Sequence, residues 1–124
     1  MSTLNGTVDY YNTQGNKQPP ITSTLTDSNG NAVDLSTAVG VIFVAASIKD
    51  LDTPVINGAA SIVGSPSNGK VQYLLTTQDI SVLLETYWAQ WIVTFSGGST
   101  QAFPQGGSPN PAYDVLYFQP SLLG

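Results

Sequence analysis

The sequence predicts an all-β domain, on three observations. Short segments rich in Val, Ile, Thr and aromatic residues alternate with clusters of Gly, Pro, Asn, Asp and Ser, which is the pattern of strands joined by turns. No segment shows a helical pattern longer than about two turns. Residues 85–95 (ETYWAQWIVTF) alternate in the way a β-strand requires. At 124 residues, the chain is expected to form one domain, residues 1–124.

Residues 1–20 are expected to hold a short strand and a polar loop. The strand is placed over 7–11, and the loop over 12–20, where two prolines stop strand pairing. The core of this single domain, residues 21–118, then begins with a strand over 21–26 that alternates Ile, Ser and Leu on one face. The sequence Asp-Ser-Asn-Gly-Asn that follows is typical of a tight turn, because Asn and Gly accept positive φ.

The middle of the chain predicts two further strands, a short strand and a helical turn. Residues 40–48 are apolar on both faces, which favours a central strand of a sheet. A short strand over 61–63 and a turn over 65–69 lead into a strand over 70–75, whose Val, Tyr and Leu point inward. The sequence Thr-Thr-Gln-Asp then fits a capping box, so we expect a helical turn over 76–84 that crosses between sheets.

The last third of the chain predicts three strands. The strand over 85–95 comes first, and Ser-Gly-Gly-Ser at 96–99 forms a hairpin turn. A short strand over 100–103 follows, and a loop over 104–111 leads to a final strand over 113–118.

Seven to eight short strands with one crossover turn predict an immunoglobulin-like sandwich of two antiparallel sheets. Tyr87 stands shortly before Trp91, as in the tyrosine corner of such domains, although the chain has no cysteine. The core must therefore be held by the packing of large apolar groups alone. The candidate core residues are Phe43, Tyr73, Leu75, Tyr87, Trp91, Val93 and Phe95.

The strand over 85–95 also carries large apolar groups, Trp88 and Ile92, on the face opposite this core. The sequence leaves two alternatives for what covers that face. Another protein chain would bury it in an assembly, or the termini and the 104–112 loop of this chain would cover it.

Composition excludes several classes of function. Only 9% of residues are charged, with three lysines, no arginine and a net charge of −5, so binding to nucleic acid is not expected. The absence of Cys and His removes disulfides, thiolate and imidazole metal sites and most hydrolase triads. No apolar run is long enough to cross a bilayer, and MSTLNGTVDY lacks the features of a secretory leader. We expect synthesis in the cytoplasm, no cofactor and a surface suited to contact with neighbours.

Three segments in this order resemble one family: 25–35 (LTDSNGNAVDL), 68–73 (NGKVQY), and 87–95 (YWAQWIVTF) leading to Phe103-Pro104. The pattern is similar to the immunoglobulin-like domain at the N-terminus of tailed-phage baseplate upper proteins and of related small phage structural proteins. The resemblance spans residues 21–118. The larger members continue into a stalk or receptor-binding region, so no receptor binding is inferred here.

The resemblance implies a non-enzymatic virion protein, made in the bacterial host cytoplasm. Its role would be that of a tail or baseplate adaptor or of a head decoration (cement) protein. Its partners would be capsid, tail or baseplate subunits or further copies of itself, with no nucleic acid and no membrane. The candidate interface residues are Trp88, Ile92, Gln105, Asn110 and Tyr117.

Other functions compete with this interpretation. Asp27, Asn29 and Asn31 offer oxygens for calcium, but a hairpin turn explains them with fewer assumptions. Glycine pairs without a following helix and Lys are better explained as turns than as phosphate loops. The remaining alternatives are paired-carboxylate chemistry and a carbohydrate-binding module. Their candidate residues are Asp34, Asp50, Asp52, Asp79 and Glu85 for the first and Tyr10, Tyr11, Trp88 and Tyr117 for the second.

Overall fold

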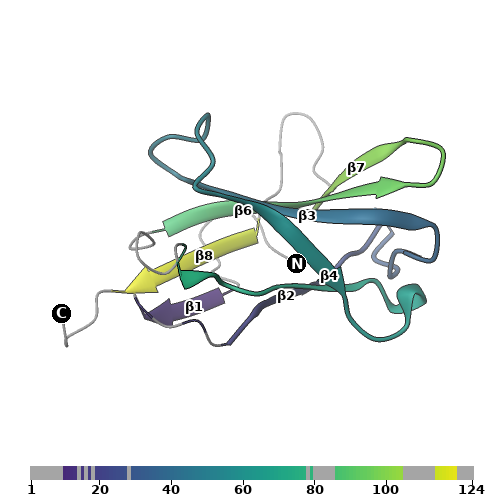
Figure 1. Cartoon of the computed structure of the whole chain (residues 1–124), viewed down its shortest axis with the longest axis horizontal. Coiled ribbons are helices and arrows are strands. Elements are labelled where there is room, and N and C mark those ends of the chain that lie inside the picture. Colours follow the sequence, from purple (N-terminus) through teal and green to yellow (C-terminus); the bar gives the residue numbers. More distant parts are fainter. Residues whose placement is uncertain are drawn as a thin grey trace.

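The computed structural model describes residues 10–13, 15, 17, 19–27, 29–77, 79, 86–104 and 114–119. This part of the chain is mostly β, as expected, and Figure 1 shows its strands. The described strands are β1 (Tyr10–Thr13), β2 (Ile21–Thr24), β3 (Ala38–Ser47), β4 (Ile56–Ile62), β5 (Lys70–Tyr73), β6 (Thr86–Phe95), β7 (Thr100–Phe103) and β8 (Asp114–Gln119). A 3-10 turn, η1 (Pro66–Asn68), precedes β5.

The described strands form one curled, mixed sheet in the order β1-β8-β6-β3-β4-β5-β2, with β7 also paired to β6. β4 changes its neighbour along its length. Its residues 56–60 pair with β3, whereas Ser61 and Ile62 pair with β5. In Figure 1, β3 and β6 run along one side of the molecule, β2 runs along the other, and β4 crosses between them.

Four strand positions differ little from the expected ones. β2, β5, β6 and β8 begin and end within two residues of the expected bounds, and β7 coincides with its expected range. β3 lies between β4 and β6, which confirms its central position. It starts at Ala38, two residues early, and a bulge interrupts its pairing with β6 between Ala38 and Gly40.

Three expectations for the strands were wrong. The short strand expected over 61–63 is the end of β4, which starts at Ile56. Strands were also expected to pair only antiparallel, but β1 runs parallel to β8, with Tyr10 opposite Leu116. Asn12 and Thr13 belong to β1 and not to the loop that was expected to start there. Residues 7–9 of the expected first strand lie outside the described residues.

The hydrophobic core lies between the β3–β6 part of the sheet and the β5–β2 part. Trp91 of β6 and Phe43 of β3 are fully buried, with ring centroids 4.5 Å apart. Phe43 also stacks on Tyr73 of β5 at 5.1 Å, although β3 and β5 are not neighbours in the sheet. The curl of the sheet therefore closes around this aromatic cluster.

Six of the seven candidate core residues are buried, and Phe95 is partly buried against the same core. The alternation in β6 accounts for this result. Tyr87, Ala89, Trp91 and Val93 are buried, and the residues between them are partly exposed. At about 2 to 3 kcal/mol for each large apolar side chain removed from water, this face is the main stabilising contribution of β6.

The turn after β2 has the geometry that its residues favour. The Asp27 carboxylate accepts hydrogen bonds from the backbone N–H groups of Asn29 (2.9 Å) and Asn31 (3.0 Å). Gly30 has a φ of 84°, a region that glycine enters at little cost. Thr26 and Ala32 then pair as an isolated bridge, so this segment is a hairpin turn.

Thr76 and Asp79 form the expected capping pair. The Asp79 N–H donates to the Thr76 hydroxyl and the Thr76 N–H donates to the Asp79 carboxylate, each at 3.0 Å. The Tyr73 hydroxyl donates to the same buried carboxylate at 2.5 Å. The cap is therefore tied to β5, while residues 80–84 of the expected helical turn lie outside the described residues.

Candidate interaction surface

The side of β3 and β6 that points away from the core carries apolar side chains in adjacent positions. Ile42 of β3 lies opposite Ile92 of β6, and Ala46 lies opposite Trp88. The same row continues to Ile48, whose backbone N–H donates to the Thr86 carbonyl. We call this surface the outer face. It comprises Ile42, Val44, Ala46, Ile48, Trp88, Gln90, Ile92 and Thr94.

The outer face is covered around Ala46 and Trp88 and is open at the Ile42 end. Trp88 lies between Ala46 of β3 and Val115 of β8 in the pairing of the strands. Ala46 and Val115 are only 6% and 3% exposed, and Trp88 is itself partly buried. By contrast, Ile42 is 41% exposed. The open end of the face therefore presents an isoleucine to solvent.

The outer face carries no charge. None of its eight members is Asp, Glu, Lys or Arg, and only Gln90 and Thr94 are polar. At the far end, the loop between β3 and β4 exposes Ile48 (45%), Leu51 (44%) and Val55 (42%). This loop projects beyond the sheet in Figure 1. An uncharged face with apolar groups at its edge is suited to contact with another protein surface.

The structure places three of the five candidate interface residues. Trp88 and Ile92 belong to the outer face and are partly buried. Tyr117 of β8 lies opposite Thr86, beside the outer face, and is also partly buried. Gln105 and Asn110 lie outside the described residues.

The aromatic platform considered for sugars is not assembled as expected. Tyr10 is buried, and its ring packs on Phe118 with centroids 5.8 Å apart. Its hydroxyl donates to the Pro19 carbonyl at 2.6 Å and accepts from the Asn12 side-chain amide, and burial raises its pKa. Tyr10 is therefore a core residue and cannot stack on a ligand.

Sequence reasoning missed Ile42 and Ile48 as surface residues. The segment GVIFVAASI was interpreted as a central strand with two apolar faces, and its exposed residues were not singled out: Ile42 and Ile48 are exposed and Val44 is partly exposed. The signal was present in the alternation with Val41, Phe43 and Ala45, which fill the core. Leu51 and Val55 carried no such signal, because loop residues follow no period.

The described carboxylates stabilise turns and caps at separate places. Asp34 accepts a hydrogen bond from the Ser36 N–H at 2.9 Å, and this bond holds its pKa below the usual value. Asp50 accepts from the Asp52 N–H, and Asp79 closes the cap described above. Glu85 lies outside the described residues. No group of three acidic residues suited to a metal ion occurs among the described residues.

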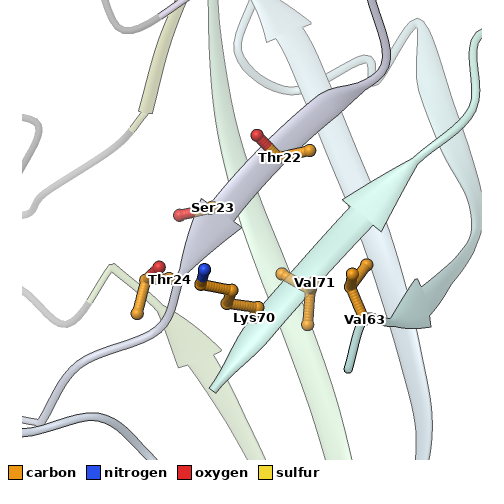
Figure 2. A pocket seen from close by; sticks show the side chains of 6 residues that line it. All are labelled: Thr22, Ser23, Thr24, Val63, Lys70 and Val71. Atoms are coloured by element: carbon orange, nitrogen blue, oxygen red, sulfur yellow. The ribbon is translucent and has the colours of Figure 1, made fainter. Parts of the chain in front are cut away.

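A pocket of about 490 Å³ lies at the other side of the molecule, on the β2–β5 part of the sheet. Figure 2 shows its walls, which come from β2, from β5 and from the residue after β4. The lining residues are Thr22, Ser23, Thr24, Val63, Lys70 and Val71. Thr22, Thr24, Val63 and Lys70 are exposed there, whereas Val71 is fully buried and belongs to the core.

Comparison with known proteins gives no family for this chain. No family model matches it, and no curated protein shows significant similarity to it. Within the described ranges, no helix has the length and apolar character needed to span a membrane.

Proposed function

We propose that this protein is a non-enzymatic structural component of a tailed-phage virion, built as an immunoglobulin-like sandwich. It docks on neighbouring virion proteins as a tail or baseplate adaptor or as a head decoration protein. The observation that carries the proposal is the uncharged outer face with exposed Ile42 at its open end. The ordered sequence pattern described above supplies the phage context.

The strand order supports the immunoglobulin-like part of the proposal. In that fold, strands C, F and G share one sheet, and strands B and E lie in the other. Taken in chain order, β2, β3, β5, β6 and β8 correspond to B, C, E, F and G, because β8-β6-β3 are neighbours and β5 pairs with β2. The stacking of Phe43 on Tyr73 joins the two layers in this assignment.

The low charge of the chain supports a role in an assembly. Three basic and eight acidic residues in 124 leave weak repulsion between copies. Covering a face such as the outer face lowers the free energy by about 25 cal/mol for each Å² of apolar area removed from water. A neighbouring subunit of similar surface provides that cover without the cost of burying unpaired charges.

Particles that lack this protein test the proposal. We expect electron microscopy to show missing density, and we expect the particles to lose integrity on heating or dilution sooner than complete particles. Purified protein added back should restore both properties. Particles of unchanged composition and unchanged stability would exclude a structural role.

Two substitutions make the add-back experiment specific to the outer face. Ile42→Asp places a charge at its open end, and Ser67→Asp adds the same charge at an exposed position in η1. We expect the Ile42 variant to fold but not to join particles, and the Ser67 variant to join them normally. Equal incorporation of both variants would remove the outer face from the docking surface.

A carbohydrate-binding module is the alternative, and one observation favours it. Trp88 and Tyr117 lie on the same side of the neighbouring strands β6 and β8. Sugar rings stack on such aromatic groups. Binding on a glycan array that is lost in Trp88→Ala would support this alternative, and an array without signal would exclude it.

A further inference from the structure

β2 has one edge whose peptide groups have no strand beside them among the described residues. It is the last strand in the order of the sheet, and among the described strands it pairs with β5 alone. The Leu25 N–H donates to the Gly69 carbonyl at 2.7 Å, just beyond the paired residues. Peptide groups alternate in direction along a strand, so those of Ile21, Ser23 and Leu25 point toward β5.

The peptide groups of Thr22 and Thr24 therefore point away from the sheet. The bonding of β5 supports this assignment. Lys70 lies opposite Thr24, and its carbonyl accepts from the Val63 N–H on the β4 side, away from β2. Lys70 and Thr24 therefore point their peptide groups away from each other. Both threonines are exposed. This edge offers two N–H donors and two carbonyl acceptors in the geometry that an added β-strand uses.

The pocket described above adjoins this edge. Thr22 and Thr24 line it, and the exposed Val63 gives it an apolar part. Figure 2 shows the amine end of Lys70 directed toward β2, near Thr24. A strand added beside β2 would place alternate side chains over this pocket, since residues opposite one another in a sheet share a face.

Lys70 sets the charge of such a strand. It is the only charged side chain of the six that line the pocket and is one of three lysines in a chain without arginine. An added strand would lie about 10 Å from β5, two strand spacings away. The four-carbon stem of Lys70, leaning over Thr24, brings its ammonium within reach of a carboxylate at the position opposite Thr24.

We propose that the β2 edge and its pocket bind an extended peptide segment of another protein, with an acidic side chain opposite Thr24. Backbone hydrogen bonds to Thr22 and Thr24 hold the peptide, and Lys70 selects the acidic residue. This site is separate from the outer face and does not depend on the phage assignment. A protein with both surfaces joins two neighbours at once.

A synthetic peptide probe tests the proposal. The probe is fluorescein-labelled TVTETVT, capped at its C-terminus as an amide, with TVTQTVT as its uncharged control. Binding is followed by fluorescence polarisation and by the amide NMR signals of the full-length protein. We expect saturable binding, with the largest shifts at Thr22 and Thr24, and roughly two- to five-fold weaker binding of the uncharged peptide.

Substitutions in the protein separate the contribution of the Lys70 charge from that of the backbone hydrogen bonds. Lys70→Gln should abolish the preference for the acidic peptide and leave the affinity for the uncharged peptide unchanged. Thr24→Pro removes one edge N–H without breaking the bonds to β5, and it should weaken binding roughly ten-fold or more. Thr24→Val keeps the backbone donor and should bind normally.

A peptide methylated at alternate backbone nitrogens provides the same test without altering the protein, and it should not bind. The proposal fails if the probe does not bind at millimolar concentration or if its shifts map to the outer face. It fails as well if the Thr24→Pro variant is folded and binds the probe as tightly as the wild-type protein does. It also fails if Lys70→Gln retains the full preference for the acidic peptide. None of these results bears on whether the outer face docks on a particle.

Discussion

Trp91 gives the sharpest test of the core, because it is fully buried at the centre of the aromatic cluster. Its ring lies 4.5 Å from that of Phe43, and its strand position lies opposite Phe103, which is also buried. A buried Trp removes about 200 Å² from water, which at about 25 cal/mol for each Å² amounts to about 5 kcal/mol. We therefore expect Trp91→Ala to lower the free energy of unfolding by about 3 to 5 kcal/mol.

That loss is large against the about 5 to 15 kcal/mol that stabilises a typical domain. The melting temperature should fall by about 10 to 30 °C at this chain length. Urea unfolding followed by far-ultraviolet circular dichroism measures the change, because this signal does not depend on the indole that is removed.

The matched control is Trp88→Ala in the same strand. Trp88 lies on the outer face and is only partly buried, so its removal should cost about 1 to 2 kcal/mol, well below the cost at Trp91. Equal losses at the two positions, or a larger loss at Trp88, would show that the faces of β6 are assigned the wrong way round.

Three further predictions concern two turns, the Thr76 cap and the buried Tyr73 hydroxyl. Gly69 has a φ of 68°, and a Cβ there would lie 2.8 Å from the Leu25 carbonyl oxygen, so Gly69→Ala should lower the free energy of unfolding by about 2 to 3 kcal/mol. Gly30 has a φ of 84° with open space around it, so Gly30→Ala should lower it by about 1 kcal/mol. Equal costs in urea unfolding would contradict the packing at Gly69. Thr76→Ala removes the hydroxyl that accepts from the Asp79 N–H and should cost about 1 kcal/mol in the same assay, whereas Thr76→Ser should cost less. Burial, and after it the hydrogen bond to Asp79, raise the pKa of the Tyr73 hydroxyl above its usual 10.0. The stability that the neutral hydroxyl contributes is therefore complete below about pH 10 and is lost as the pH rises above that value. Unfolding free energies measured across this range should fall more steeply for the wild type than for Tyr73→Phe, and parallel curves would rule the effect out.

The sequence predicted β6 well because its signal is local. The alternation of Tyr87, Ala89, Trp91 and Val93 fixes both the strand and its buried face, whatever its partners are. The Asp27 turn and the Thr76 cap were predictable for the same reason. Each is specified by residues within five positions of one another.

The beginning of β4 was not predictable from local signals. Residues 58–60 are Gly-Ala-Ala, which have low strand propensity, and the pairing of this segment with β3 determines its conformation. Gly58 is small for a reason that lies elsewhere in the chain. A Cβ at this position would come within 2.9 Å of the Tyr73 ring.

The parallel pairing of β1 with β8 joins segments about 100 residues apart, and no pattern within either segment specifies its direction. Of the two candidate surfaces, one was predictable from the sequence and the other was not. The alternation in β6 located Trp88 and Ile92, but the β2 edge depends on which strand ends the sheet, and only the assembled topology determines that.

The change of neighbour within β4 has a mechanical consequence. The ribbon formed by β2 and β5 is joined to the rest of the sheet through the paired residues Ser61 and Ile62 of β4 and one further hydrogen bond at Val63. Tension applied across the strands, at right angles to β2, by a bound neighbour would load these few bonds one after another. Under such force this ribbon should peel away first and leave the β3–β6 pair intact.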